Sequence, residues 1–590
     1  MQLHPFDWVL IAGYFVVCVW IGLAVRRRAG RNSTEFFLAG RNMPWWLLGV
    51  SMVATTFSAD TPNLVSDIVR THGVAGNWVW WAFLLTGMLT AFIYARMWRR
   101  SGVFTDIEFY ELRYSGKPAA FLRGFRALYL GLMFNVLVMA SVTLAAMKIA
   151  GVILGWEPWQ TGLIAGTVTV IYSAAGGLRG VLLTDLLLFI GAMTGSILAA
   201  WWLVGIPEIG GLGPLLEHEN VRDRLSILPD FDNWELVLTV LIIPLAVQWW
   251  SVWYPGAEPG GGSYQAQRML AARDEKGAAA ASVLFNVAHY ALRPWPWIIV
   301  ALCSLVVFPD LDSLKDAFPD LPIGIVGEDL GYSAMLTYLP PGLLGLAMAS
   351  LIAAYMSTAS THINLGASYL VNDFYKRFVR TEAGEKELVF VGRVSTVVIL
   401  LLAILFALSL RHALEAFSII LQIGAGTGLI FILRWFWWRI TAIAEITAMV
   451  VSFAVALYFH FLLPETASWQ RLLIGVAITT VSWVTVTLIT PPASKETLYS
   501  FYRKVRPGGP GWRKVRDQAA REGISLEPEG EGWHVPSGIL CMFLGCVSIY
   551  GALFATGFWI YGEILQAILL TVVSIVGIVF LNRAWRRLTW

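Results

Sequence analysis

Apolar runs of about 20 residues recur along almost the whole sequence and are separated by short charged loops. A helix of that length can cross the hydrocarbon core of a bilayer. It also satisfies its own backbone hydrogen bonds, which the bilayer interior requires. The pattern therefore predicts an all-α polytopic membrane protein with about 15 spans.

Polar residues interrupt the apolar run over 343–375 along one side of the predicted helix. Positions three, four and seven residues apart share a helix face. That face carries Ala354, Ser357, Thr358 and Thr361, and it is flanked by Ser360 and Asn364. Hydroxyl and carbonyl oxygens at mid-membrane depth suit a small hard cation such as Na⁺. Alternatively, these residues only permit close helix packing or bond back to the preceding turn.

The span predicted over 44–67 is broken by a polar cluster, Thr55, Thr56, Ser58, Asp60, Thr61, Pro62 and Asn63. Proline removes a backbone donor, and the polar side chains offer replacement partners at the break. An unwound segment exposes carbonyls that can coordinate a cation and side chains that can hold a polar solute. A carboxylate at this depth is costly unless it is paired or used, so Asp60 is a candidate solute residue. The alternative is that Asp60 lies in water at the outer mouth.

Two later spans also carry polar groups. Span 234–254 contains Pro244 and Gln248 near its middle and is a second candidate broken helix. Span 278–308 contains Asn286, His289 and Arg293 before a kink at PWPW, residues 294–297. Arg293 is either a partner of Asp60 or of an anionic solute, or a structural cation near the outer half.

Asp185 lies one turn into the span that follows a Gly-Gly turn at 176–177. Its charge either favours the start of that helix or faces the hydroxyl stripe of 343–375 from a neighbouring helix. The sequence alone leaves both interpretations open.

The composition supports the membrane assignment, because 57% of the residues are hydrophobic and only 14% are charged. If the amino terminus lies outside and the carboxyl terminus inside, most of the 42 Lys and Arg residues fall in cytoplasmic loops, as the positive-inside rule requires. The net charge of +3 then reflects topology, and nothing indicates nucleic-acid binding. No cleavable signal peptide is expected, since MQLHPFDW lacks a basic region.

Enzyme and metal-cluster chemistry find no support in the sequence. The four cysteines all lie in predicted spans, which argues against a disulfide framework and a zinc site. Neither HExxH nor a nucleophile–base motif appears among the eight histidines. We therefore expect a protein that is not an enzyme.

The predicted spans and loops divide the chain into five parts. Residues 1–43 form a leading transmembrane helix and a cytoplasmic loop, 44–436 a core of ten helices, and 437–490 two accessory helices. Residues 491–536 form a basic cytoplasmic loop, and 537–590 two C-terminal helices. The loop is rich in Gly and Pro, which predicts that it is disordered or lies on the membrane surface.

Four stretches resemble the sodium:solute symporter family, which includes sodium/glucose, proline, pantothenate and sialic acid cotransporters. They are FFLAGRNMPWWLLGVSMVATTFSA (36–59), AAGGLRGVLLTD (174–185), QRMLAARD (267–274), and AAYMSTASTHIN leading to NDFY (353–375). The resemblance implies a LeuT-type inverted repeat of five plus five helices, with one extra N-terminal and several extra C-terminal helices. Core helices 1, 6 and 8 would be 44–67, 234–254 and the helix within 343–375.

The resemblance also implies the site residues. A first sodium would bind the backbone carbonyls of Ala54 and Phe57, with Ala354, Ser357 and Thr358. A possible second sodium would bind Asp185, Ser360 and Thr361. The solute would lie beside the helix 1 break, where the candidates are Thr56, Ser58, Asp60 and Thr61, together with Gln248, Asn286, His289 and Arg293.

The function implied is sodium-coupled symport of a small polar solute (a sugar, an amino acid or a carboxylate) across the cell membrane by alternating access. Na⁺ is the expected coupling ion, the lipid bilayer is the surroundings, and no obligatory protein partner is evident. The solute stays open, because Phe189 replaces a common Gln, the sugar-binding residues are not clearly reproduced, and core helix 3 lacks an Arg in its middle. Proton coupling through Asp185 or Asp60 is one alternative. A transporter-like sensor or a channel is a weaker one, since no output module or pore-loop pattern is present.

Overall fold

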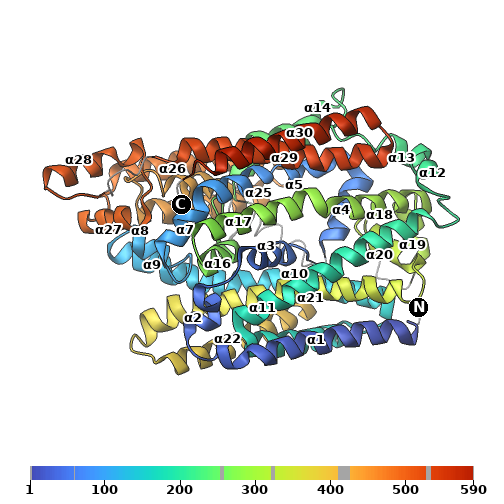
Figure 1. The fold of residues 1–590 in the computed structure, drawn as a ribbon, viewed down its shortest axis with the longest axis horizontal. Helices are drawn as coiled ribbons and strands as arrows, with labels where there is room; N and C mark the ends of the chain where they lie inside the picture. Colours follow the sequence, from blue (N-terminus) through green and yellow to red (C-terminus); the bar gives the residue numbers. More distant parts are fainter. Residues whose placement is uncertain are drawn as a thin grey trace.

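The structure is a computed structural model that describes residues 3–58, 60–252, 258–319, 326–409, 425–526 and 533–588. Within these ranges the chain is helical, and the sole extended pairing is an isolated β-bridge between Met43 and Ala272. Figure 1 shows long helices running side by side along the longest axis of the molecule. The all-α prediction is confirmed for the described residues.

The bounds of the helices follow the chain in three groups. The first group is α1 (Pro5–Ala29), α2 (Ser33–Leu38), α3 (Trp45–Thr55), α4 (Thr61–His72), α5 (Trp78–Trp81), α6 (Leu84–Leu89), α7 (Ala95–Ser101), α8 (Phe109–Arg113), α9 (Gly116–Leu128) and α10 (Asn135–Leu154). The second is α11 (Pro158–Val204), α12 (Leu212–Glu217), α13 (Glu219–Arg222), α14 (Trp234–Val237), α15 (Ile243–Ala246), α16 (Ser263–Ala271), α17 (Glu275–Asn286), α18 (Pro294–Val307), α19 (Leu311–Ala317) and α20 (Leu330–Met335). The third is α21 (Leu343–Ser368), α22 (Glu385–Ser409), α24 (Gly428–Leu433), α25 (Ala442–Leu462), α26 (Ser468–Ile489), α27 (Lys495–Val505), α28 (Arg513–Arg521), α29 (Val535–Tyr561) and α30 (Ile564–Trp585).

Several of these helices continue into one another through wider π-helical turns, such as η7 (Val287–Leu292) between α17 and α18 and η9 (Tyr369–Val379) after α21. Counted with these turns, the described part of the chain contains 11 helices that are long and apolar enough to cross a membrane. α11 alone is 47 residues long and contains a break at Gly177, where φ is 52° and ψ is −156°. A Cβ atom there would meet the Phe36 carbonyl oxygen at 2.5 Å, so only glycine fits.

Two other spans are interrupted where the sequence predicted breaks. α3 ends at Thr55 and α4 begins at Thr61, which leaves a non-helical connection at the polar cluster. In the second span, α15 ends at Ala246, and Val247 departs from helical geometry with φ −130° and ψ −47°. Pro62 lies in the first turn of α4, whereas Pro244 lies within α15, three residues before Val247. A proline cannot donate the helical hydrogen bond.

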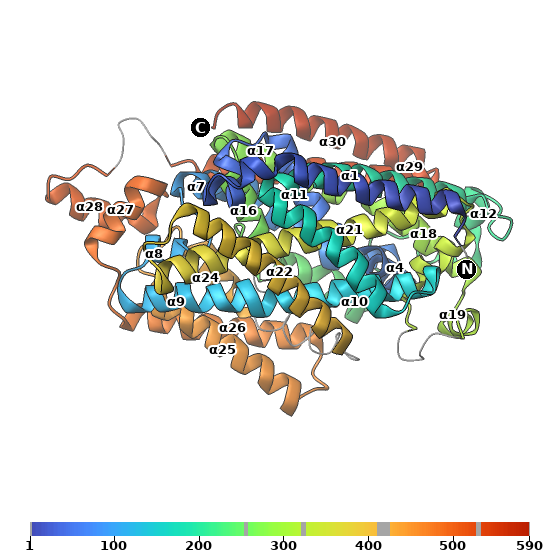
Figure 2. The ribbon, with the colours of Figure 1, turned by 90° about the horizontal axis from the view of Figure 1, so that it is seen from below.

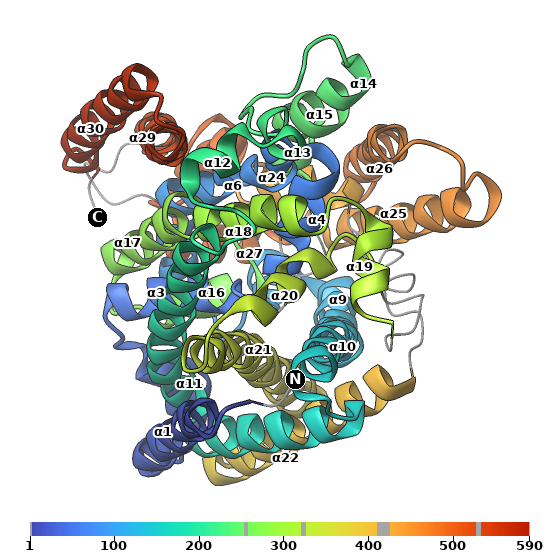
Figure 3. The same ribbon diagram turned by 90° about the vertical axis from the view of Figure 1, so that its right-hand side faces the viewer.

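α21 is the most enclosed of the long helices, because nearly all of its residues are buried. It packs against α11, α1, α10, α22 and α3. Figure 3 shows α21 within a ring of these helices, whereas the α25–α26 and α29–α30 pairs lie at the periphery. The stripe of hydroxyl residues is therefore surrounded by protein and does not face lipid.

Residues 491–526 are folded, so the prediction of disorder is wrong for this part of the loop, whereas the alternative position on the membrane surface stays a prediction. α27 and α28 lie at one end of the bundle, beyond α7 and α8 (Figure 2). The Phe501 and Trp512 rings stack with centroids 5.4 Å apart, and both are fully buried. Composition suggested disorder because the glycines and prolines are frequent, but aromatic residues spaced along the segment supply a core.

Candidate functional site

The end of α3 and the middle of α21 meet at the first predicted cation site. The Thr358 hydroxyl oxygen lies 2.9 Å from the Thr55 carbonyl oxygen and 3.1 Å from the Ala354 carbonyl oxygen, and these two acceptors share its single proton. Ala54, Phe57, Ala354 and Thr358 are all buried. Helix α3 ends here, so the Thr55 carbonyl oxygen accepts from α21 instead of from a further helical turn, whereas the Ala54 carbonyl oxygen accepts from the Phe57 N–H at 3.1 Å. Neutral oxygens from two helices thus converge at this point.

Ser357, the next residue on α21, turns toward a different helix. Its hydroxyl donates to Asp185 Oδ1 on α11 at 2.6 Å. Because the hydroxyl proton goes to the carboxylate, the Ser357 oxygen keeps lone pairs for a cation. Ser357 thus lies between the first predicted cation site and Asp185. Asp185 faces the stripe on α21, as one of the two sequence interpretations held.

Asp185 is completely buried and accepts a second hydrogen bond, from the Ser51 hydroxyl of α3, at 2.5 Å. Thr361 lies in the same cluster, with its hydroxyl oxygen 3.0 Å from that of Thr55. The Ser360 hydroxyl instead donates to the Ser357 carbonyl oxygen at 3.1 Å. Ser357 and Ser51 thus contact the buried carboxylate directly, whereas Ser360 and Thr361 form no hydrogen bond to it in the described structure.

Arg268 of α16 enters this cluster, which the sequence did not predict. Its guanidinium is fully buried and donates to the Thr361 hydroxyl at 2.7 Å and to the Ser51 hydroxyl at 3.2 Å. The distance from its Nη2 to Asp185 Oδ2 is 3.8 Å. A positive charge from the chain thus compensates Asp185 in this conformation. Arg268 is the first Arg of QRMLAARD (267–274). That stretch supported the family resemblance, but it predicted no role for this side chain.

A second polar network surrounds Thr56 at the helix break. The Thr56 hydroxyl donates to the Val53 carbonyl oxygen at 2.8 Å. The same oxygen lies 2.9 Å from Arg293 Nη1 and 3.1 Å from His289 Nδ1. Arg293 Nη2 and His289 Nε2 are 3.2 Å apart. Three of the predicted solute residues, from two separate spans, are thus in direct contact.

Aromatic rings enclose this network. The Arg293 guanidinium lies over the Trp297 ring, 5.1 Å from its centroid, and Trp297 packs edge-on against Phe57 at 4.8 Å. His289 contacts the rings of Trp80 and Tyr290 at 5.7 and 4.5 Å. The network therefore has polar groups at the break and an apolar wall, which is typical of a small-molecule site.

The remaining predicted solute residues take different positions. The Gln248 amide is 3.4 Å from the Val79 carbonyl oxygen, and Asn286 donates to the Ser282 carbonyl oxygen within its own helix. The Thr61 hydroxyl is 3.4 Å from the Thr56 carbonyl oxygen. The Ser58 hydroxyl is buried and lies close to the Asp60 carboxylate. Asp60 is exposed and has no ion pair in the described ranges, so the suggested Asp60–Arg293 contact is not formed.

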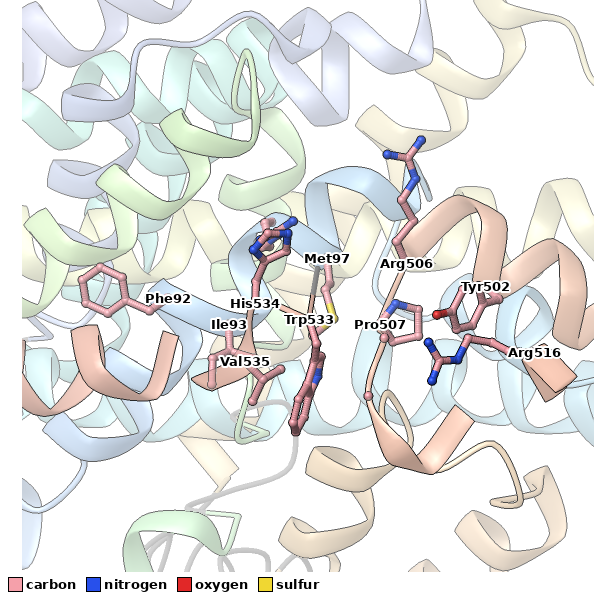
Figure 4. A pocket seen from close by; sticks show the side chains of 13 residues that line it. Phe92, Ile93, Met97, Tyr502, Arg506, Pro507, Arg516, Trp533, His534 and Val535 are labelled. Atoms are coloured by element: carbon pink, nitrogen blue, oxygen red, sulfur yellow. The ribbon is translucent and has the colours of Figure 1, made fainter. Parts of the chain in front are cut away.

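A separate cavity of about 230 Å³ lies near α27 and the start of α29. Figure 4 shows its lining, which includes Arg506, Arg516, Trp533 and His534. None of the predicted cation or solute residues lines it. This cavity is therefore separate from the candidate site at the helix break.

The Sodium:solute symporter family model matches residues 36–452. This chain belongs to that family. It is 27% identical over 480 residues to a sodium/glucose cotransporter of Vibrio parahaemolyticus, an alignment that covers 77% of this chain and 85% of the relative. It is 26% identical over 423 residues to a sodium/mannose cotransporter of Bos taurus, covering 68% of each.

The fold is also that of a solved family structure. A substrate-bound, outward-open Na⁺-coupled sialic acid symporter superposes with a TM-score of 0.68 at 19% identity, covering 83% of this chain and 99% of that one. The family assignment made from motifs is confirmed, and with it a multi-pass membrane protein that uses Na⁺ as its coupling ion. The relatives named here are transporters and not enzymes.

Proposed function

We propose that this protein is a sodium-coupled secondary active symporter that imports a small polar organic solute by alternating access. The supporting observation is the hydrogen bond from the Thr358 hydroxyl to the Thr55 carbonyl oxygen, which brings α21 to the open end of α3. A Na⁺ ion held there by Ala54, Phe57, Ala354, Ser357 and Thr358 would bridge the two helices. Import requires the proposed orientation, with the amino terminus outside and the carboxyl terminus inside.

Sodium and solute are coupled by linkage in this proposal. The ion stabilises the conformation in which the helix break is formed, and Thr56 of the solute network is part of the same break. Each ligand therefore raises the affinity for the other by the same factor. The membrane potential adds about 2.3 kcal/mol per charge for each 100 mV to the inward step.

A second Na⁺ belongs to the same proposal, at Asp185, Ser360 and Thr361. The carboxylate and the neighbouring hydroxyls are the hard oxygens that Na⁺ prefers. Arg268 donates to Thr361 in this conformation, so a second ion requires Arg268 to withdraw. We propose that Arg268 and the second Na⁺ alternate, which keeps the Asp185 charge compensated at every stage.

Uptake into proteoliposomes tests the proposed function. The purified chain is reconstituted, and uptake is measured for sugars, amino acids and carboxylates under an inward Na⁺ gradient, a matched choline gradient, or a proton gradient. We expect accumulation that requires Na⁺ and stops when the gradient is collapsed. Accumulation driven equally by the proton gradient without Na⁺ would favour proton coupling instead.

A further inference from the structure

Arg293 is a buried cation that faces no carboxylate in the described structure. It is only 2% exposed, and it lies between η7 and α18, beside the helix break. Its polar contacts are the Thr56 hydroxyl and the His289 ring, both uncharged acceptors. Buried charges in membrane helices are costly unless they are paired or used for function.

Other buried arginines of this protein are compensated. Arg70 lies 2.6 Å from Glu328, Arg123 2.8 Å from Asp373, and Arg434 3.5 Å from Glu445. Arg113 faces no carboxylate directly, but it donates to the backbone carbonyl oxygens of Arg434 and Trp437. Arg293 has neither kind of partner among the described residues. Its charge is therefore available to a ligand.

The hydrogen bonds around Arg293 determine which groups carry protons. The Thr56 hydroxyl has one proton and donates it to the Val53 carbonyl oxygen. Its oxygen must then accept from both Arg293 Nη1 and His289 Nδ1. His289 Nε2 carries no proton, because it accepts from Arg293 Nη2. His289 is thus neutral, and the network carries one net positive charge.

Arg293 also keeps unused donors. Two of its N–H groups are engaged by Thr56 and His289, and the buried Nε has no partner. A guanidinium presents its N–H groups in a planar fork that matches the two oxygens of a carboxylate. Thr56 and His289 are themselves partly exposed, so a ligand can approach the network from their side.

We propose that the transported solute carries a carboxylate, which binds the guanidinium of Arg293, while Thr56 and His289 hold that guanidinium in place. This inference rests on the proposed function, because it takes the helix break as the solute site. It narrows the solute class from polar molecules in general to small organic acids, with the aromatic wall contacting the rest of the molecule.

The position of Arg293 also explains how an acid would be coupled to sodium. Thr56 lies between Thr55, whose carbonyl accepts from Thr358, and Phe57, a candidate sodium residue. Trp297 contacts both Arg293 and Phe57. A carboxylate bound to Arg293 would thus lie near a Na⁺ ion at the break, where opposite charges attract strongly in a water-poor setting. Each would then strengthen the binding of the other.

The first test compares acids with their neutral counterparts in proteoliposomes of the wild-type full-length protein. The pairs are glucuronate and glucose, lactate and lactamide, and nicotinate and nicotinamide. We expect Na⁺-driven uptake of at least one acid, with its neutral partner taken up at least tenfold more slowly. Uptake of neutral members at equal or higher rates, or of no member of any pair while Na⁺ still stabilises the protein, overturns the inference.

The second test changes the charge at position 293. For the acid found above, Arg293→Gln should raise KM by at least 100-fold, whereas Arg293→Lys keeps the charge and should raise it less. Na⁺ should still raise the thermal unfolding temperature of both variants. Arg222→Gln is the matched control, because Arg222 is an arginine whose side chain is 65% exposed and far along the chain from the break. Unchanged acid affinity in Arg293→Gln overturns the inference.

The net charge moved per solute needs no variant, so it remains decisive if Arg293→Gln does not fold. Glucuronate, lactate and nicotinate each carry one negative charge, so for whichever of them is transported the charge moved should be one less than the number of Na⁺ ions transported. A charge equal to the Na⁺ number overturns the inference but leaves sodium symport standing. Loss of any Na⁺ dependence, in uptake and in thermal stability, would instead refute the proposed function.

Discussion

Two neighbouring regions of α21 differ in the charge of the groups that surround them. At Thr358 the oxygens are neutral and come from a hydroxyl and from carbonyls at the open end of α3. At Ser357 and Thr361, one helical turn apart, the surroundings contain the buried Asp185 carboxylate and the Arg268 guanidinium. The first region contains only neutral oxygens, as our proposed sodium site requires, whereas the second contains two charged side chains of the chain itself.

The difference follows from the cost of burying charge. A cation can leave a site of neutral oxygens without leaving an isolated charge in the membrane. Such an ion can therefore exchange freely. A carboxylate cannot stand alone at that depth and needs a permanent or alternating counterion. Ser357 contacts Asp185 and is also a proposed ligand of the first sodium, so the two regions would share one residue.

The largest effect on these two regions is expected at Asp185. Asp185→Asn removes the carboxylate and leaves Arg268 buried without a counterion, which should cost roughly 3–5 kcal/mol of stability. Thermal unfolding in detergent measures this loss. The double variant Asp185→Asn/Arg268→Gln removes both charges and should recover most of it. If the double variant is no more stable than Asp185→Asn, the two residues do not compensate each other.

Substitutions in the neutral region around Thr358 should weaken Na⁺ binding but leave folding unchanged. Thr358→Ala removes one oxygen, which should cost roughly 1–3 kcal/mol of Na⁺ binding, or about 5- to 150-fold in half-saturating Na⁺. Na⁺-dependent uptake or Na⁺-induced thermal shift measures it. Ser357→Ala should weaken Na⁺ activation as well.

Thr485→Ala is the control for Thr358→Ala. The Thr485 hydroxyl bonds back to the Val481 carbonyl oxygen on α26, away from both regions. It should leave the Na⁺ response unchanged. If both Thr358→Ala and Ser357→Ala keep wild-type Na⁺ dependence, these residues do not form the first sodium site.

The number of Na⁺ ions bound per transport cycle tests whether the second region also binds an ion. If the second region binds Na⁺ when Arg268 withdraws, the Hill coefficient for Na⁺ should exceed one in the wild type. It should fall to one in Asp185→Asn/Arg268→Gln, which lacks the carboxylate that would hold the second ion. A Hill coefficient near one in both proteins, together with a one-to-one reversal potential, would leave the Asp185 region a structural ion pair.

The smallest effect is expected at Asp60, which is exposed and outside both regions. Asp60→Asn removes a negative charge near the break and should lower KM for an acidic solute. The change in the binding free energy of the solute should be less than about 1 kcal/mol, because the group is solvated. Half-saturating Na⁺ should change less than KM. The reverse pattern would place Asp60 in the ion site.

Much of the architecture was predictable because its causes are local. Apolar runs of bilayer length and the prolines near the helix breaks act through neighbouring atoms, and the positive φ at Gly177 is a local preference of glycine. The stripe on α21 was readable for the same reason, since helical periodicity decides which residues share a face. The folded segment over 491–526 was missed, because its aromatic core depends on contacts with α8 and Trp435 as well as on its own composition.

The class of protein, the positions of the helix breaks and the residue types that could bind Na⁺ follow from local sequence patterns. Which of these residues are in contact depends on the packing of the helices. Ser357 turns to Asp185, Arg268 enters the second region, and Arg293 joins Thr56, across separations of 172, 93 and 237 residues. Periodicity tells which face a residue occupies but not which helix that face meets. Pairing of buried charges therefore depends on how the whole bundle packs.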